Sequence, residues 1–304
     1  MQLNTIQLAR YRFIFQVTEP ICLPDYAGST LRGVFGRALR KIACMTKQDN
    51  CKACPLYQTC PYTNIFETPP KEHQIQKFSQ VPNGYIIEPP QWGEKIYRVG
   101  EILSFELVLF GKLIDQLPLI AFAFQRAFQY SVAKGKGELV DILHQQNKDF
   151  YSIYVDGKLL DHSTEIQIKA PQSNSITLTI TTPLRLQANG TPLNAQNITL
   201  ERFLLTLAKR ISLLSEFHAV PLDLDFVKLK ENLTAINDHK NLKWLDWRRY
   251  SSRQNQKMAL GGVVGQWQLN NVPEDWQKLL YWGQWLHCGK NATFGLGKYE
   301  ITNL

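Results

Sequence analysis

The stretch ITLTITTPLRL (residues 176–186), followed by LERFLLTLAKRISLLSEF (residues 200–217), sets the pattern for the whole chain. In the first segment polar residues alternate with Ile and Leu, which predicts a strand with one buried face. In the second, apolar residues recur every three or four positions, which predicts an amphipathic helix. Beyond a loose segment (221–241), the patterns predict strands 242–250 and 258–269, a helix over 273–286 and a strand over 293–301. This half of the chain therefore has the order β-α-β-β-α-β.

The first half shows a less regular form of the same order. Its patterns predict a strand over 5–18, a helix over 28–43, strands 85–88 and 102–110, a helix over 115–132, and strands near 139–143, 150–155 and 166–168. Two such units predict an α+β protein with two tandem ferredoxin-like (RRM-like, βαββαβ) domains, residues 1–172 and 173–304. RNA-recognition domains share this topology, but a fold alone does not establish a function.

Composition narrows the class of partner. The chain has 304 residues, 44% of them hydrophobic, and a formal net charge of +8, which favours a polyanion such as nucleic acid over a membrane surface. No run of 18 apolar residues and no secretory signal pattern occurs, so we expect a cytoplasmic protein without a membrane partner. The sequence has no Walker loop, no G-x-S-x-G and no paired-carboxylate metal motif, which argues against a nucleotide hydrolase or a metal-dependent nuclease.

A cysteine-rich loop, residues 44–60, interrupts the first domain. Cys44, Cys51, Cys54 and Cys60 have the spacing C-x6-C-x2-C-x5-C, which matches thiolate ligation of a tetrahedral zinc ion. Such a zinc would be structural, because four thiolates leave no open position for chemistry. Reduced thiols without a metal and an iron–sulfur cluster are the alternatives.

Two segments concentrate basic residues. The helix predicted over 28–43 carries Arg32, Arg37 and Arg40 outside its apolar stripe. A turn near residue 250 carries Arg248, Arg249, Arg253 and Lys257, interleaved with Trp244, Trp247 and Tyr250. Cations can hold phosphates while rings stack on bases, so both segments are candidate RNA-binding elements. The alternative for the turn is a solvated hairpin whose aromatic residues face the core.

The loop WLHCGKNATFGLGKY (residues 285–299) holds three glycines, Gly289, Gly295 and Gly297, together with Lys290 and Lys298. Glycines let backbone N–H groups approach a ligand closely, and lysines suggest that the ligand is an anion. His287 falls at the end of the preceding helix, where the helix dipole favours the protonated imidazole. The loop therefore predicts an acid beside an anion site. A tight turn from helix to strand, with an incidental histidine, is the alternative.

Four anchors, one of them made of two stretches, resemble known sequences. GSTLRG (28–33) is similar to the first-helix motif of the repeat-associated mysterious protein (RAMP) superfamily of CRISPR systems. CPLYQTCPYTNIFE (54–67), RYSSR (249–253) with GGVVG (261–265), and HCGKNATFGLGKY (287–299) resemble one branch of the CRISPR precursor-RNA processing endoribonucleases, a branch with a four-cysteine insertion. The resemblance implies tandem ferredoxin-like domains, with the glycine-rich loop 289–297 facing the first helix.

The resemblance also implies an activity. Members cleave CRISPR precursor RNA within the repeat without a metal: the 2′-hydroxyl attacks the adjacent phosphorus and leaves a 2′,3′-cyclic phosphate and a 5′-hydroxyl. Such chemistry needs a base, an acid and cations for the phosphorane charge. Many members place the catalytic histidine in or just after the first helix, yet this sequence has no histidine before His73. We predict that His287 acts as general acid or base and Lys290 as phosphate clamp, with Tyr26 and Arg37 orienting the RNA. Alternatively, Tyr26 acts with arginines and lysines.

Other functions share many of these features. A non-catalytic RNA-binding RAMP subunit, holding guide RNA in an effector complex, would have the same fold and basic segments. A zinc-stapled protein-interaction scaffold is a third hypothesis. The expected partners are CRISPR repeat RNA, as precursor and as processed guide, then effector-complex subunits and a second copy of the chain. We expect no cofactor for catalysis, and structural zinc only.

Overall fold

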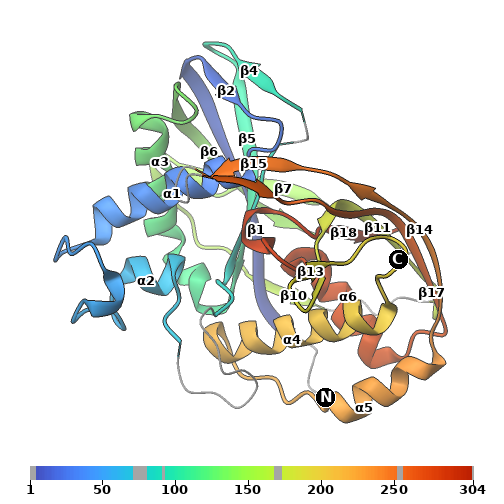
Figure 1. Cartoon of the computed structure of the whole chain (residues 1–304). Helices are drawn as coiled ribbons and strands as arrows, with labels where there is room; N and C mark the ends of the chain where they lie inside the picture. The colour runs from blue at the N-terminus through green and yellow to red at the C-terminus, as the bar shows by residue number, and fades with distance from the viewer. Residues whose placement is uncertain (1–4, 71–80, 91–92, 168–172, 252–255, 303–304) are drawn as a thin grey trace. The chain divides into compact units, whose positions relative to one another are not determined.

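The computed structural model of the chain describes residues 5–70, 81–90, 93–167, 173–251 and 256–302. The chain forms two compact units (Figure 1). The N-terminal unit takes in Ile6–Ile166 and Leu213–Val220, and the C-terminal unit takes in Gln167–Ser212 and Pro221–Leu304, with Thr5 grouped with the latter.

The frame of the N-terminal unit is β1 (Thr5–Glu19), α1 (Gly28–Ala43), β3 (Tyr85–Glu88), β5 (Ile102–Phe110), α3 (Leu117–Tyr130) and β6 (Lys136–Gln146). Its strands lie in the order β3-β5-β1-β6, and each neighbouring pair is antiparallel. β7 (Asp149–Ser152) extends the sheet beyond β6, and β10 (Glu165–Gln167) also pairs with β1. The four-strand order is that of a ferredoxin-like βαββαβ domain.

Short elements decorate this frame. Two small ladders join β2 (Ile21–Leu23) to β4 (Lys95–Tyr97) and β8 (Tyr154–Val155) to β9 (Lys158–Leu159). The helical additions are η1 (Cys51–Ala53), α2 (Pro61–Phe66) and η2 (Gly111–Gln116). The segment from η1 to α2 holds most of the cysteine-rich loop.

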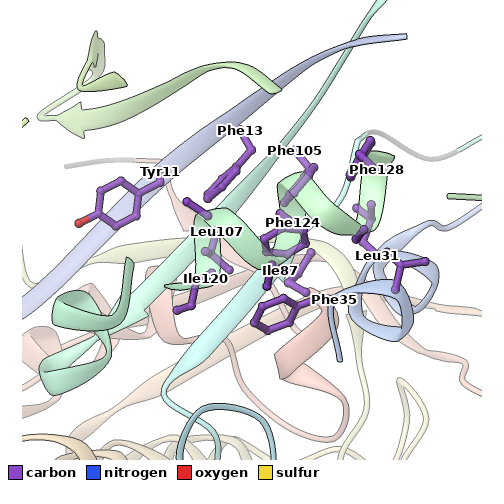
Figure 2. Close-up of a cluster of buried hydrophobic side chains, with 14 of the residues drawn as sticks. Tyr11, Phe13, Leu31, Phe35, Ile87, Phe105, Leu107, Ile120, Phe124 and Phe128 are labelled. Carbon is purple, nitrogen blue, oxygen red and sulfur yellow. The ribbon is translucent and has the colours of Figure 1, made fainter. Parts of the chain in front are cut away.

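The core of the N-terminal unit follows from the alternation along β1. Phe13 on this strand has no exposed surface and stacks on Phe105 of β5, with ring centroids 5.5 Å apart. Phe35 of α1 stacks on Phe124 of α3 at 4.6 Å. Figure 2 shows this cluster of rings and, at its end, Tyr11 with its hydroxyl pointing away from the phenylalanines. Burying one such ring contributes about 1.5–3 kcal/mol, so this aromatic layer is a main source of the unit's stability.

The C-terminal unit repeats the frame with β11 (Ile176–Leu184), α4 (Leu200–His218), β14 (Asn237–Leu245), β17 (Gly262–Asn270), α6 (Glu274–Leu286) and β18 (Tyr299–Ile301). The strand order is β14-β17-β11-β18, again antiparallel throughout. Its additions are β12 (Gln187–Ala188), β13 (Thr191–Pro192), α5 (Phe226–Glu231), η3 (Asn232–Ala235), β15 (Arg248–Ser251), β16 (Gln256–Ala259) and η4 (Ala292–Phe294). The predicted pair of ferredoxin-like folds is confirmed.

Helix α4 contributes to both units. Its last turn, from Leu213 onward, groups with the N-terminal unit, although these residues lie beyond residue 172. The buried ring of His218 donates a hydrogen bond from Nε2 to the carbonyl oxygen of Pro82, 2.8 Å away. A Cβ added at Gly84 would come within 2.9 Å of this ring, and one at Gly111 would collide with the His218 carbonyl. Two glycines of the N-terminal unit therefore make room for the end of α4.

Three predicted strands of the C-terminal unit differ from the structure. The strand predicted over 293–301 is a turn, η4, followed by the short β18, because Gly295 and Gly297 have φ values of 97° and 71° that interrupt an extended chain. The strands predicted over 242–250 and 258–269 are each divided, into β14 with β15 and β16 with β17.

Candidate functional site

The loop after α6 turns sharply, and its glycines are required by the protein's own packing. Gly289 has φ 86°, and a Cβ there would lie 2.6 Å from the carbonyl oxygen of Arg185. A Cβ at Gly297, where φ is 71°, would collide with the carbonyl oxygen of Cys288. The glycines thus bring segments of this unit's backbone together, which is sufficient to explain their presence without a ligand.

Hydrogen bonds fasten this loop to the end of β11 and the residues that follow it. The hydroxyl of Thr182 donates to the Gly295 carbonyl at 2.8 Å and accepts from the Lys298 amide at 2.8 Å. The Lys290 amide donates to the Arg185 carbonyl at 3.0 Å. These bonds hold the loop in one shape, so its outward side chains start from a fixed position.

His287 lies inside this arrangement. Its side chain is 0% exposed, and its Nδ1 is 3.2 Å from the Leu296 carbonyl oxygen. Its φ of 53° is unusual for a residue with a side chain, and it turns the chain out of α6. The predicted role of His287 as general acid or base stays untested, but the structure shows no surface of this side chain that RNA could touch.

A buried arginine supports the same turn. Arg210 of α4 donates from Nε to the carbonyl oxygens of Leu286 and His287, at 2.8 and 3.1 Å. A cation at these carbonyls opposes the negative end of the α6 dipole. Burial lowers the pKa of Arg210 to about 10 and raises that of neighbouring Cys288 to about 12. At neutral pH the arginine therefore remains charged and the thiol remains protonated.

The lysines of the loop differ in exposure. Lys290 is exposed, whereas Lys298 is half-buried and its carbonyl accepts a hydrogen bond from the Thr181 amide at 3.0 Å. Lys290 is thus the lysine of this loop best placed to meet a phosphate from solvent.

The residues predicted on and before α1 fall into three environments. Tyr26 is 3% exposed, and burial, with the nearby Glu88 adding to it, holds the pKa of its phenol well above the usual range. Arg32 lies 4.2 Å over the ring of Phe66. Arg40 donates to the carbonyl oxygens of Gln48 and Asp49 at 2.6 and 3.1 Å.

Arg37 is the fourth of these residues. Its side chain is exposed, and within the described part of the chain it makes no ion pair or side-chain hydrogen bond. Arg37 is therefore the α1 arginine most available for an RNA phosphate.

The basic turn forms a hairpin. β15 carries Arg248 and Arg249, and β16 carries Lys257, with Tyr250 opposite Lys257 in the register. Arg253 lies outside the described residues. The Leu260 amide donates to the Trp247 carbonyl at 2.7 Å, which closes the base of the hairpin.

The structure does not support the predicted zinc site. The four cysteines lie half-buried between α1 and α2, but among the described residues no group of three or more His, Cys, Asp or Glu is arranged to hold a metal. Burial raises the pKa of the Cys51 thiol, and the charge of Arg40 offsets only part of that rise. The Cys54 sulfur lies 3.3 Å from the Thr46 hydroxyl. Arg40 lies beside Cys44 and Cys51 in this loop, structural zinc stays a prediction, and the four-cysteine insertion as a family mark is not confirmed.

Sequence reasoning missed the residues that fix the loop. Thr182 and Arg210 sit within a strand and a helix whose patterns explain them as ordinary surface positions. Nothing local to either residue indicates that it contacts a segment more than 70 positions away. A search for polar residues that face helix ends would need the fold first.

Comparison with known proteins relates each half of the chain to a family model. Residues 6–167 match the AF_1859_N family model, described as an N-terminal domain, and residues 178–299 match the model of the CRISPR-associated endoribonuclease Cas6. No curated protein matches the chain. Within the described residues, none of the helices has the length and apolar character of a membrane-crossing segment.

Solved structures share the fold. The Cas6 (TTHB231) product complex of Thermus thermophilus is 12% identical, with 97% of this chain and 99% of that one covered at a TM-score of 0.59. The Cas6 (TTHA0078) product complex is 15% identical, covering 97% and 98% at 0.54. A chain of a partial Cas6-RT-Cas1–Cas2 complex is 14% identical, covering 98% of this chain and 46% of that one at 0.61. The chain therefore carries a Cas6-type endoribonuclease domain over residues 178–299, and its two units together have the fold of solved Cas6 structures.

Proposed function

We propose that the protein cleaves CRISPR precursor RNA within the repeat without using a metal ion. The 2′-oxygen upstream of the scissile bond forms a bond to the adjacent phosphorus, and the bond from phosphorus to the 5′-oxygen breaks. A base takes the proton of the 2′-hydroxyl, and an acid delivers a proton to the leaving 5′-oxygen. The products carry a 2′,3′-cyclic phosphate and a 5′-hydroxyl. The match of residues 178–299 to the Cas6 endoribonuclease model supports RNA cleavage as the reaction.

The observation that carries this proposal is the fixed glycine-rich loop with exposed Lys290. Its backbone is held to Arg185, so the lysine extends from a rigid support. A preorganised cation of this kind stabilises the negative charge that develops on the phosphorane. Arg37, exposed on α1, would bind a phosphate of the RNA backbone.

Tyr26 and His287 take different roles in this scheme. The raised pKa of Tyr26 keeps its proton in place at neutral pH, so the phenol can donate a hydrogen bond but cannot serve as a base. His287 is fully buried against Leu296, and we assign it to holding the loop. Its substitution would then slow cleavage by displacing Lys290, and free imidazole would not restore the rate.

A cleavage assay tests the proposed reaction. The purified protein is incubated in EDTA with RNA that carries its own locus's CRISPR repeat, beside a copy with a 2′-deoxy residue at the mapped cut site. We expect one cut in EDTA, with a cyclic phosphate at the new 3′ end, and no cut in the deoxy copy. Cleavage of the deoxy copy, or cleavage that requires added Mg²⁺, would overturn the mechanism.

A non-catalytic RNA-binding subunit is the second candidate, and one observation favours it. Two of the three side chains predicted for catalysis, Tyr26 and His287, are buried. Such a subunit would bind and protect the repeat RNA and would generate no cyclic phosphate. Light scattering on the same sample would test the predicted homodimer.

A further inference from the structure

The sheet of the C-terminal unit has one apolar face and one polar face, and the register identifies which side chains lie on each. On β14 and β17, Lys240 is opposite Trp267, and the Trp267 indole donates to Asp238 at 2.7 Å. Trp267 has no exposed surface, so these residues face the helices. Side chains alternate along a strand, so their neighbours in the sequence face the other way.

Three amide side chains lie together on this outer face. Asn241 of β14 is opposite Gln266 of β17, and Gln268 is opposite His239 in the next row. All four side chains are exposed. Rows two residues apart along a strand are separated by about 6.8 Å. We call Asn241, Gln266 and Gln268 the amide face.

Stability does not explain the amide face. Within the described part of the chain, none of the three amides has a side-chain hydrogen bond or an ion pair. Asn is depleted in strands, and exposed amides bury no apolar area. The formal charges nearest to them in the register are Lys243, opposite Val264, and Glu300, opposite Thr179, which leaves the face close to neutral. A neutral amide surface suits the edges of bases better than it suits phosphates.

The same two strands lead directly into the basic hairpin. β14 continues into β15, and β16 returns into β17, so one ribbon carries the amide face and then Arg248, Arg249 and Lys257 (Figure 1). Phosphate contacts fix the position of a nucleic acid, while contacts to base edges provide sequence specificity. Amide side chains of Asn and Gln pair in bidentate fashion with adenine, and RNA exposes base edges where it is unpaired.

We propose that the amide face reads base edges of unpaired adenine-containing RNA whose backbone is held by the adjacent basic hairpin. Asn241 with Gln266, and Gln268 in the next row, would contact successive nucleotides. This inference rests on the proposed function, since it names the part of the RNA substrate that the protein distinguishes.

The test separates base reading from phosphate binding. Asn241→Ala, Gln266→Ala and Gln268→Ala are made singly and together, and Lys243→Ala on the same ribbon is the matched control. Dissociation constants are measured for the repeat RNA, and for copies in which each unpaired adenine is replaced in turn, at several salt concentrations. Unchanged melting temperatures show that the variants fold, as expected for exposed positions.

We expect wild type to bind at least one substituted RNA about 5-fold or more weakly, and the triple amide variant to lose that discrimination while keeping the salt dependence. Lys243→Ala should weaken all RNAs to a similar extent and reduce the salt slope by about one. If the triple variant ranks the substituted RNAs in the same order of affinity as wild type, the amide face does not read bases. That result would leave the proposed cleavage reaction unaffected. If wild type neither binds nor cuts repeat RNA, the proposed function itself has failed.

Discussion

Thr182 offers the sharpest test of the glycine-rich loop. Thr182→Val keeps the shape of the side chain but removes two hydrogen bonds of 2.8 Å, to the Gly295 carbonyl and from the Lys298 amide. Leaving a buried polar group without its partner costs about 1–3 kcal/mol. Gly295 is buried and Lys298 is half-buried, so we expect a loss of about 2–4 kcal/mol in the free energy of unfolding.

The neighbouring threonine provides the control. Thr181 is exposed, and its hydroxyl makes one long hydrogen bond, 3.4 Å, to the Lys298 carbonyl. Thr181→Val should therefore cost about 0.5 kcal/mol or less. Urea unfolding at pH 7 measures both, and single-turnover cleavage of repeat RNA at low urea shows whether the loop positions Lys290. Equal stability of the two variants would refute the reasoning that Thr182 fastens the loop.

Three further outcomes are expected. Lys290→Ala should slow single-turnover cleavage about 10²-fold with little change in RNA affinity. The control Lys230→Ala, on α5, should leave the cleavage rate unchanged. If Lys290→Ala weakens RNA binding strongly but leaves the cleavage rate unchanged, Lys290 is a binding residue. Burial, with the charge of His162 adding to it, lowers the pKa of His144 in the folded protein to about 4. Between pH 6.5 and 4 the unfolded chain therefore binds a proton at this residue that the folded protein does not, so the free energy of unfolding should fall as the pH drops through this range. His144→Phe should flatten that slope in urea unfolding at pH 7 and 4.5, and an unchanged slope would contradict this assignment. Elemental analysis of the purified protein should find less than one zinc ion per chain. If wild type holds one zinc ion per chain and Cys51→Ser holds none, the cysteine loop rearranges around a metal.

Periodicity predicted the fold well because each frame element buries one regular face. The helix predicted over 28–43 has the observed bounds of α1, and strand 102–110 has those of β5. The prediction was wrong at 293–301, where the pattern of apolar residues continues through a turn. Gly295 and Gly297 break the strand there, because their positive φ values matter more to the local path than the buried Phe294 and Leu296.

The candidate site was harder to predict for a physical reason. Spacing placed His287 at a helix end beside glycines, but spacing does not determine whether a side chain at that point turns inward or outward. That direction depends on Arg210 and Leu296, which meet His287 only after folding. The cysteine spacing has the same weakness, because Arg40 is brought among those thiols by α1.

The path of α4 limits how such proteins can be divided or recombined. A fragment that ends near residue 172 would lack the turn carrying His218, and the space that Gly84 and Gly111 leave for it would be empty. If the N-terminal half were exchanged for that of a distant relative, the last turns of α4 would contact residues with which they had not evolved. If the two halves were inherited separately, the end of α4 from Leu213 onward would therefore have to be transferred together with the N-terminal half.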